Sequence, residues 1–197
     1  MPRGRNIRLS LPRRFICDLM HFARQVPTVP VQRRMNLAAL VKARDEAEPR
    51  PSWCAIFTKA FGIVAAARPE LRRAYLSFPW PHLYEHPLNV ASIALERSIG
   101  GEEGVFFAPL RRPENTGLAD LDATLRRLKE ERLETIAPFR RAVKLTCLPR
   151  PVRRFVWWLA LNVWGRKRAR YMGTFGVTVY AGLGAASLHP LSSTVFS

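Results

Sequence analysis

The chain has 197 residues, 48% of them hydrophobic, so it can bury one good core and we expect one domain. Its 32 Lys and Arg against 15 Asp and Glu give a formal net charge of +17, which favours either an anionic partner (nucleic acid, acidic lipid or a phosphorylated small molecule) or a merely solvated basic surface. Three separated cysteines without a Cys-x-x-Cys pair argue against a disulfide framework and a zinc site and indicate a reducing compartment. No apolar run reaches the roughly 20 residues of a spanning helix. We therefore expect a cytoplasmic protein, and peripheral contact with a membrane surface stays open.

The N-terminal part predicts a basic, flexible segment over residues 1–11 and a helix over 12–24. Three apolar residues of this helix recur at helical spacing: Phe15, Leu19 and Phe22. We expect a strand over 29–35 next, and then a helix over 36–46 that Asn36 can cap.

The most apolar helix is predicted over 53–67, after a proline-rich break. Because Ile56, Phe61 and Val64 fall on different sides of it, the helix is apolar almost all round. We therefore expect it to be the central buried helix. Prolines 79 and 81 mark a loop further on.

The most informative stretch is 89–131, around which we expect the fold to be organised. Two apolar runs, 90–95 and 105–110, are joined by a glycine-rich turn that permits the positive φ of a hairpin. Neither run alternates between apolar and polar residues, so both strands should be covered on two faces. The helix that follows carries its leucines on one stripe: Leu118, Leu121, Leu125 and Leu128.

Two further helices are predicted over 137–148 and 151–163, followed by a strand over 173–180. The second helix is rich in tryptophan and has basic residues on both sides. Two interpretations stay open for Trp157, Trp158 and the nearby Trp164. They lie in a membrane interface, or they pack against the sheet or a neighbouring subunit.

Few residues are candidates for chemistry. His82 and His86 are four apart, but the surrounding prolines argue against a helix that would bring them together, and no third metal ligand accompanies them. His21 lies beside an apolar helical face, and His189 lacks a nearby carboxylate to hold its tautomer. The sequence has no nucleophile elbow, phosphate loop or dinucleotide fingerprint, and its arginine pairs come without a recognised nucleic-acid fold. We therefore expect neither a metal nor a nucleic-acid partner.

Several segments, in the same order and at similar spacing, resemble one known family: Asn89–Ala94, Gly104–Leu110, Gly117–Leu121 with the charged helix after it, and Gly173–Val179. Together they look like the catalytic core of the dihydrolipoyl acyltransferases of 2-oxoacid dehydrogenase complexes. The N-terminal part is similar to the related chloramphenicol acetyltransferases.

The resemblance implies a fold of the α+β class, a chloramphenicol acetyltransferase-like α/β sandwich in which a mixed sheet is flanked by helices. It also implies a homotrimer with active sites between subunits. Residues 12–197 would then be one partial acyltransferase-like domain, incomplete at its C-terminus, with a tryptophan-rich basic helical insert at about 137–170. The family's His-x-x-x-Asp-Gly motif, which supplies the general base, is absent from the sequence, and we expect no lipoyl attachment in this chain.

Two residues match functional positions of that family. Thr178 falls on a hydroxyl that stabilises the oxyanion, and Arg14, or its neighbour Arg13, matches an arginine that structures the site. We therefore expect a coenzyme-A-dependent acyltransferase-like protein, with coenzyme A or acyl-CoA as substrate and without complete catalytic machinery in this chain. The alternative is a non-catalytic interaction protein that binds an anionic membrane surface or a partner subunit through the tryptophan helix.

Overall fold

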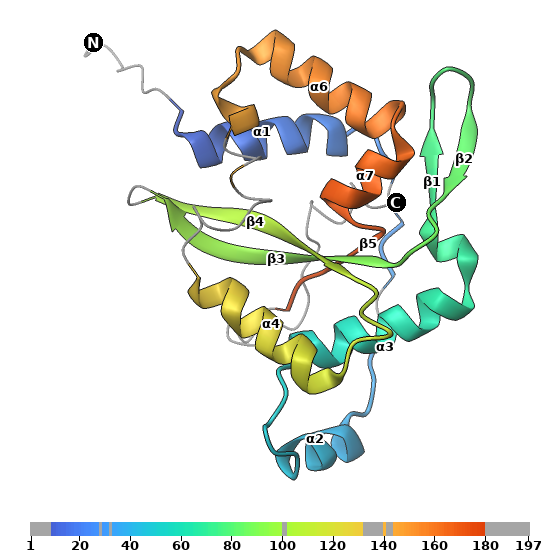
Figure 1. Cartoon of the computed structure of the whole chain (residues 1–197), viewed down its shortest axis with the longest axis vertical. Coiled ribbons are helices and arrows are strands. Elements are labelled where there is room, and N and C mark those ends of the chain that lie inside the picture. Colours follow the sequence, from blue (N-terminus) through green and yellow to red (C-terminus); the bar gives the residue numbers. More distant parts are fainter. Residues whose placement is uncertain are drawn as a thin grey trace.

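The computed structural model describes residues 9–27, 29–31, 33–99, 102–131, 140 and 144–179. In chain order its elements are α1 (Leu11–Ala23), α2 (Ala38–Asp45), α3 (Trp53–Ala67), the 3₁₀ helix η1 (Pro69–Arg72), β1 (Arg73–Leu76), β2 (His82–Glu85), β3 (Val90–Ile99), β4 (Glu102–Arg111), α4 (Leu118–Glu130), α6 (Arg150–Asn162), α7 (Gly165–Met172) and β5 (Phe175–Val177) (Figure 1). These helices and small sheets confirm the predicted α+β class.

The fold is organised around a three-stranded mixed sheet with the order β4-β3-β5. Strands β3 and β4 pair antiparallel from Val90↔Arg111 to Ile99↔Glu102, so the predicted hairpin of 90–95 and 105–110 is confirmed. Strand β5 pairs parallel with β3, with Ala91 opposite Phe175. The predicted strand over 173–180 therefore forms over three of its residues.

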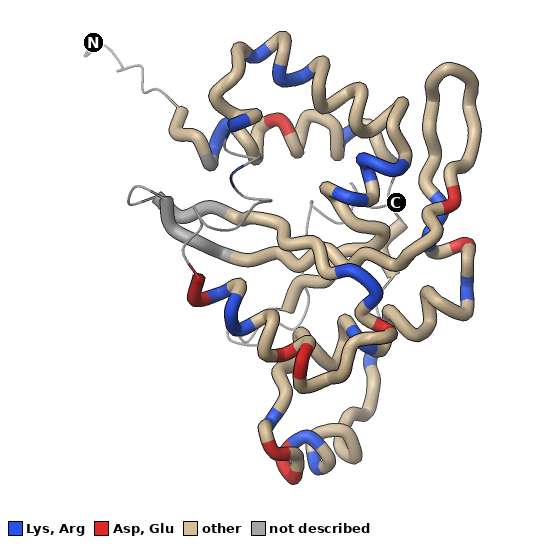
Figure 2. The backbone as a smooth tube through the Cα atoms, in the orientation of Figure 1, with Lys and Arg blue, Asp and Glu red and all other residues tan. Residues whose placement is uncertain are grey.

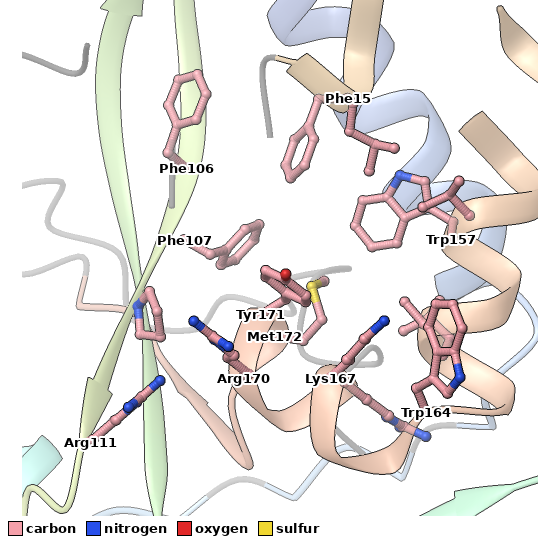
Figure 3. Close-up of a pocket in the computed structure, with 16 residues that line it drawn as sticks. Phe15, Phe106, Phe107, Arg111, Trp157, Trp164, Lys167, Arg170, Tyr171 and Met172 are labelled. Carbon is pink, nitrogen blue, oxygen red and sulfur yellow. The ribbon is translucent and has the colours of Figure 1, made fainter. Parts of the chain in front are cut away.

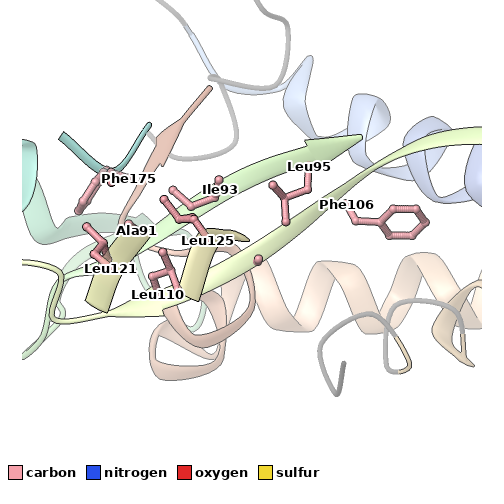
Figure 4. Packing of buried hydrophobic residues seen from close by; sticks show 10 residues of the cluster. Ala91, Ile93, Leu95, Phe106, Leu110, Leu121, Leu125 and Phe175 are labelled. Carbon is pink, nitrogen blue, oxygen red and sulfur yellow. The ribbon is translucent and has the colours of Figure 1, made fainter. Parts of the chain in front are cut away.

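Both faces of this sheet are covered, as the lack of alternation predicts. Helices α3 and α4 lie on one face, where the buried cluster of Figure 4 includes Ile93, Phe106 and Leu121. Helices α1, α6 and α7 lie on the other, where Phe107 packs with Phe15 and Trp157. The leucine stripe of α4 forms as predicted, with two leucines buried and two partly buried against the first cluster.

Asp122, on α4, is buried and ties that helix to the start of α3. Its Oδ1 accepts a hydrogen bond from the backbone N–H of Ser52 at 2.9 Å, and its Oδ2 accepts one from Arg126 Nε at 2.8 Å. Burial raises the pKa of this carboxyl, but the hydrogen bonds from Ser52 and Arg126 outweigh burial, so the pKa of Asp122 lies below its ordinary value.

Replacing Asp122 by asparagine is therefore expected to lower the free energy of unfolding at neutral pH by about 1–2 kcal/mol. Since the pKa is lower in the folded state, the ionised carboxyl contributes stability above its unfolded pKa of about 3.9, and this contribution disappears as the pH falls through the folded value. Chemical denaturation of both proteins from neutral to acidic pH measures the difference. If the difference does not shrink on acidification, the stabilising role of the ionised form is excluded.

Two predictions for the N-terminal half are wrong. The described residues between 29 and 35 form no strand, because Pro30 cannot donate a ladder hydrogen bond. Val29 and Val31 are 86% and 76% exposed. Helix α3 forms, but it is not the central buried helix. Its small face lies inward, with Gly62 close to Pro113, while Ile63 and Val64 are 53% and 51% exposed.

Two elements were not predicted. The stretch around the loop at 79–81 is a hairpin, in which β1 and β2 pair antiparallel and the ion pairs of Arg72 and Arg73 with Glu85 (3.8 and 3.0 Å) join its two ends. Its strands have four residues each, too short to show a period. The basic run after the tryptophan helix is α7. The tryptophan helix itself is confirmed as α6. Of the helix predicted over 137–148, residues 140 and 144–147 are helical, while 137–139 and 141–143 lie outside the described residues.

Candidate functional site

A cavity of about 490 Å³ lies between β4 and helices α1, α6 and α7, on the face of the sheet that these three helices cover (Figure 3). This volume is within the range of small-molecule sites, roughly 300–1,000 Å³. Its walls come from α1, β4, α6 and α7, together with Leu145. The lining residues are Phe15, Phe106, Phe107, Pro109, Arg111, Leu145, Val156, Trp157, Ala160, Leu161, Trp164, Lys167, Arg168, Arg170, Tyr171 and Met172.

One end of the cavity is aromatic. The ring of Phe15, on α1, stacks on Phe106 of β4 with centroids 6.4 Å apart, and it also contacts Trp157 of α6 at 5.8 Å. Phe15 and Trp157 are buried because their helices turn these faces toward the sheet. The aromatic side chains of this end can accept an apolar group, and the indole N–H of Trp157 is a hydrogen-bond donor among them.

The other end is cationic. Figure 3 shows Arg111, from β4, on the same side of the cavity as Lys167 and Arg170 of α7. Lys167 Nζ lies 3.5 Å from the ring centroid of Trp164, a cation–π contact that holds the ammonium at the rim. Among the described residues that line the cavity none is acidic, so the positive charge there is not neutralised from within.

Arg168, also at this end, has a structural contact. Its Nη1 donates a hydrogen bond to the backbone carbonyl of Tyr75 at 2.8 Å, which joins α7 to the β1–β2 hairpin. Burial lowers the pKa of the Arg168 guanidinium. An arginine with a lowered pKa still stays protonated at neutral pH, so Arg168 adds to the positive potential at this end.

A buried ion pair holds α1 against α6, two of the helices that line the cavity. Asp18 and Arg153 are 1% and 6% exposed, and Arg153 Nε donates to Asp18 Oδ2. Arg153 Nη1 also donates to the carbonyls of Thr146 and Leu148, at 3.1 and 3.2 Å. The sequence contains no signal of this pair, since Arg153 stands among the basic residues at the start of the tryptophan helix and its partner is far away in the chain.

Neither residue predicted from the family resemblance lines the cavity. Arg14 is on α1, which packs over β4, and its Nε donates to the carbonyl of Leu9 at 2.9 Å. Thr178 directly follows β5, at the opposite edge of the sheet, and is exposed. The structure therefore does not bring the two together in one site within this chain, and their family roles stay predictions.

The histidines in the described part of the chain have local partners. Nδ1 of His82 lies 2.7 Å from the carbonyl of Trp80, and Nδ1 of His86 lies 2.7 Å from the carbonyl of Leu88. Neither these two nor His21 lines the cavity, and His189 lies outside the described residues. No group of three or more His, Cys, Asp or Glu that could hold a metal ion occurs among the described residues.

The three tryptophans of the basic helical region have different environments. Trp157 is buried at the aromatic end of the cavity, as the packed interpretation predicts, and Trp164 lines the cavity with 39% of its surface exposed. Trp158 is 36% exposed and does not line the cavity. Within the described residues no helix is long and apolar enough to cross a membrane.

No protein-family model and no curated protein matches this chain. The cavity, aromatic at one end and cationic at the other, is the feature of the described residues that most resembles a ligand-binding site.

Proposed function

We propose that this chain is a coenzyme-A-dependent acyltransferase-like protein whose cavity binds coenzyme A or its acyl thioester. The observation that carries the proposal is the cavity's division into an aromatic end and a cationic end. Coenzyme A has the matching division, with phosphates at one end and an apolar acyl thioester at the other. The sequence resemblance over 89–131 and 173–180 supports the same assignment.

The cationic end suits phosphate recognition. Arg111 and Arg170 carry guanidinium forks that can donate two parallel hydrogen bonds to one phosphate, and Lys167 adds a compact charge. Binding of the phosphates there leaves the thioester pointing toward Phe15 and Phe106. Burial of the acyl group against these rings would add the hydrophobic part of the affinity.

The activity that we assign to the described residues is binding, since no histidine among them lines the cavity. Acyl transfer needs a general base near the acceptor thiol or hydroxyl. By resemblance, we propose that the chain acts as a homotrimer and that catalysis depends on groups brought to the site from other parts of the assembly.

Replacing Arg111 or Arg170 by alanine is expected to weaken coenzyme A binding about tenfold or more in each case, since a hydrogen bond to a charged group contributes roughly 1.5–3 kcal/mol. Calorimetric titration with coenzyme A, dephospho-coenzyme A and pantetheine measures this, and the two variants should bind pantetheine as the wild type does. Arg127→Ala is the matched control, because Arg127 is 71% exposed on α4 and does not line the cavity. Absence of any coenzyme A heat with the wild-type chain, or equal weakening in the control, excludes the proposal.

A second function, interaction with another surface, is favoured by one observation on α6. Its inward side chains line the cavity, whereas Phe155 and Trp158 point outward and are 58% and 36% exposed. Because the two functions use different faces of α6, this one does not compete with ligand binding in the cavity.

A further inference from the structure

Helix α6 is apolar on its outward stripe as well as on the side that lines the cavity, which is unusual for a surface helix. Its arginine at 153 is buried and paired with Asp18, while apolar side chains lie on the outward stripe. Val152 and Phe155 on this stripe are 47% and 58% exposed, and the ring of Trp158 stacks on Phe155 with centroids 6.3 Å apart. A surface helix ordinarily turns polar residues outward, so this stripe indicates contact with something apolar.

The tip of the β1–β2 hairpin continues the same surface. Phe78 and Trp80 are 49% and 67% exposed, and the ring of Phe78 lies 5.9 Å from that of Trp158. Two hydrogen bonds fix the tip to the end of α6: Ser77 Oγ to Asn162 Oδ1 at 2.9 Å and Phe78 N–H to the Asn162 carbonyl at 3.3 Å. Figure 1 shows the hairpin beside the C-terminal end of α6. We name Phe78, Trp80, Val152, Phe155 and Trp158 together the aromatic platform.

The surroundings of the aromatic platform are strongly basic. Helices α6 and α7 together contain seven Lys and Arg and no Asp or Glu. Figure 2 shows Lys and Arg, and no acidic residue, along α6 and α7. Arg150 and Arg166, at the first turns of these helices, are exposed. A partner here has to be apolar where it meets the platform and negative around it.

We propose that the aromatic platform docks the protein on an anionic lipid bilayer, with α6 lying parallel to the membrane plane. Tryptophan and phenylalanine are favoured at the boundary between headgroups and acyl chains, and arginines beside them meet the negative headgroups. The platform lies on a helix and a hairpin that are bonded to each other, so both reach the bilayer together. This proposal rests on the second function above and specifies its partner.

Charge complementarity favours a bilayer over a second copy of this chain. If two copies met through their platforms, the arginines around one platform would lie close to those around the other, and these like charges would repel. An anionic bilayer supplies opposite charge over the whole basic surface. Each Lys or Arg near such a surface is worth a factor of about 5 in binding.

Flotation of the full chain with vesicles tests the proposal. The wild type should float with mixed phosphatidylcholine–phosphatidylserine vesicles, float much less with phosphatidylcholine alone, and dissociate at raised salt. The double variant Phe78→Ala/Trp80→Ala should bind these vesicles at least about tenfold more weakly, since it removes two aromatic rings that the bilayer would bury. Arg150→Gln and Arg166→Gln should each lose about fivefold.

The matched controls are Ile63→Ala/Val64→Ala, an apolar pair on α3 with about half of each side chain exposed, and Arg127→Gln on α4. Both should bind vesicles as the wild type does. Equal losses in the controls, or no flotation of the wild type, overturn the proposal. A second result also overturns the proposal: the wild type does not bind vesicles, and the platform variant differs from it in sedimentation coefficient. The platform would then be a protein–protein contact between copies of the chain. Coenzyme A titration of the platform variant should be unchanged, so failure here is distinct from failure of the cavity assignment.

Discussion

Replacing Asp18 by alanine is expected to lower the free energy of unfolding by about 3–5 kcal/mol, because it leaves the buried Arg153 without its counter-charge. The carboxylate accepts from Arg153 through both of its oxygens, and Arg154 Nε lies 3.7 Å from Oδ1. After the substitution the Arg153 guanidinium keeps only the carbonyls of Thr146 and Leu148 as acceptors among the partners described. Chemical denaturation of the wild type and the variant, followed by tryptophan fluorescence, measures the loss.

Two further variants separate loss of the charge pair from general damage. Asp45→Ala removes an exposed carboxylate that lies 2.6 Å from Arg50, and it should cost no more than about 1 kcal/mol. The double variant Asp18→Leu/Arg153→Met should recover much of the stability lost in Asp18→Ala, since apolar side chains of similar volume can replace a buried ion pair. A cost for Asp18→Ala as small as that of Asp45→Ala would show that the pair does not hold α1 on α6.

The same ion pair links stability to the cavity. Asp18 is one helical turn from Phe15, and Arg153 is one turn from Trp157, so the pair fixes the separation of the two rings that form the aromatic end. We therefore expect coenzyme A binding to weaken in Asp18→Ala even under conditions where the variant is folded. The double variant, which restores packing without charge, should bind more tightly than Asp18→Ala.

The centre of the fold was predictable from the sequence because it depends on local patterns. The runs at 90–95 and 105–110 are apolar on both faces, and they form adjacent strands covered on both sides. The leucine stripe after Gly117 is a 3.6-residue period, and α4 follows it. In each case a short stretch of sequence contains the whole signal.

What could not be predicted depends on contacts between distant segments. Arg153 looks like a surface charge until α1 brings Asp18 against it, 135 residues away in the chain. The cavity likewise exists only where α1, β4, α6 and α7 meet. Helix α3 shows the opposite error, since its composition predicts burial but not which side faces the core, and its inward side is the one with small residues.

Replacing Gly173 by alanine is expected to lower the free energy of unfolding by about 2–5 kcal/mol, through backbone strain and a steric clash. Gly173 connects α7 to β5 with φ 82° and ψ 175°, a conformation that only glycine adopts readily. A Cβ there would lie 2.7 Å from the Val90 carbonyl oxygen and 2.9 Å from Ser92 Cβ, both on β3. Neither neighbour can yield easily, because β3 is the central strand of the sheet.

The damage should extend from β5 to the cavity. The Val90 carbonyl accepts the N–H of Thr174 at 2.7 Å, and the Thr174 hydroxyl lies 3.0 Å from the N–H of Val90, so pushing Gly173 away from β3 disturbs the start of the parallel pairing. Met172, which lines the cavity, directly precedes Gly173 and moves with it. Gly176→Ala on β5 is the matched control: Gly176 is exposed, and the substitution should change stability by less than about 1 kcal/mol. Denaturation curves of Gly173→Ala and Gly176→Ala that coincide would mean that the backbone at 173 can relax, and that the junction of α7 with the sheet is not rigid enough to position the cationic end of the cavity.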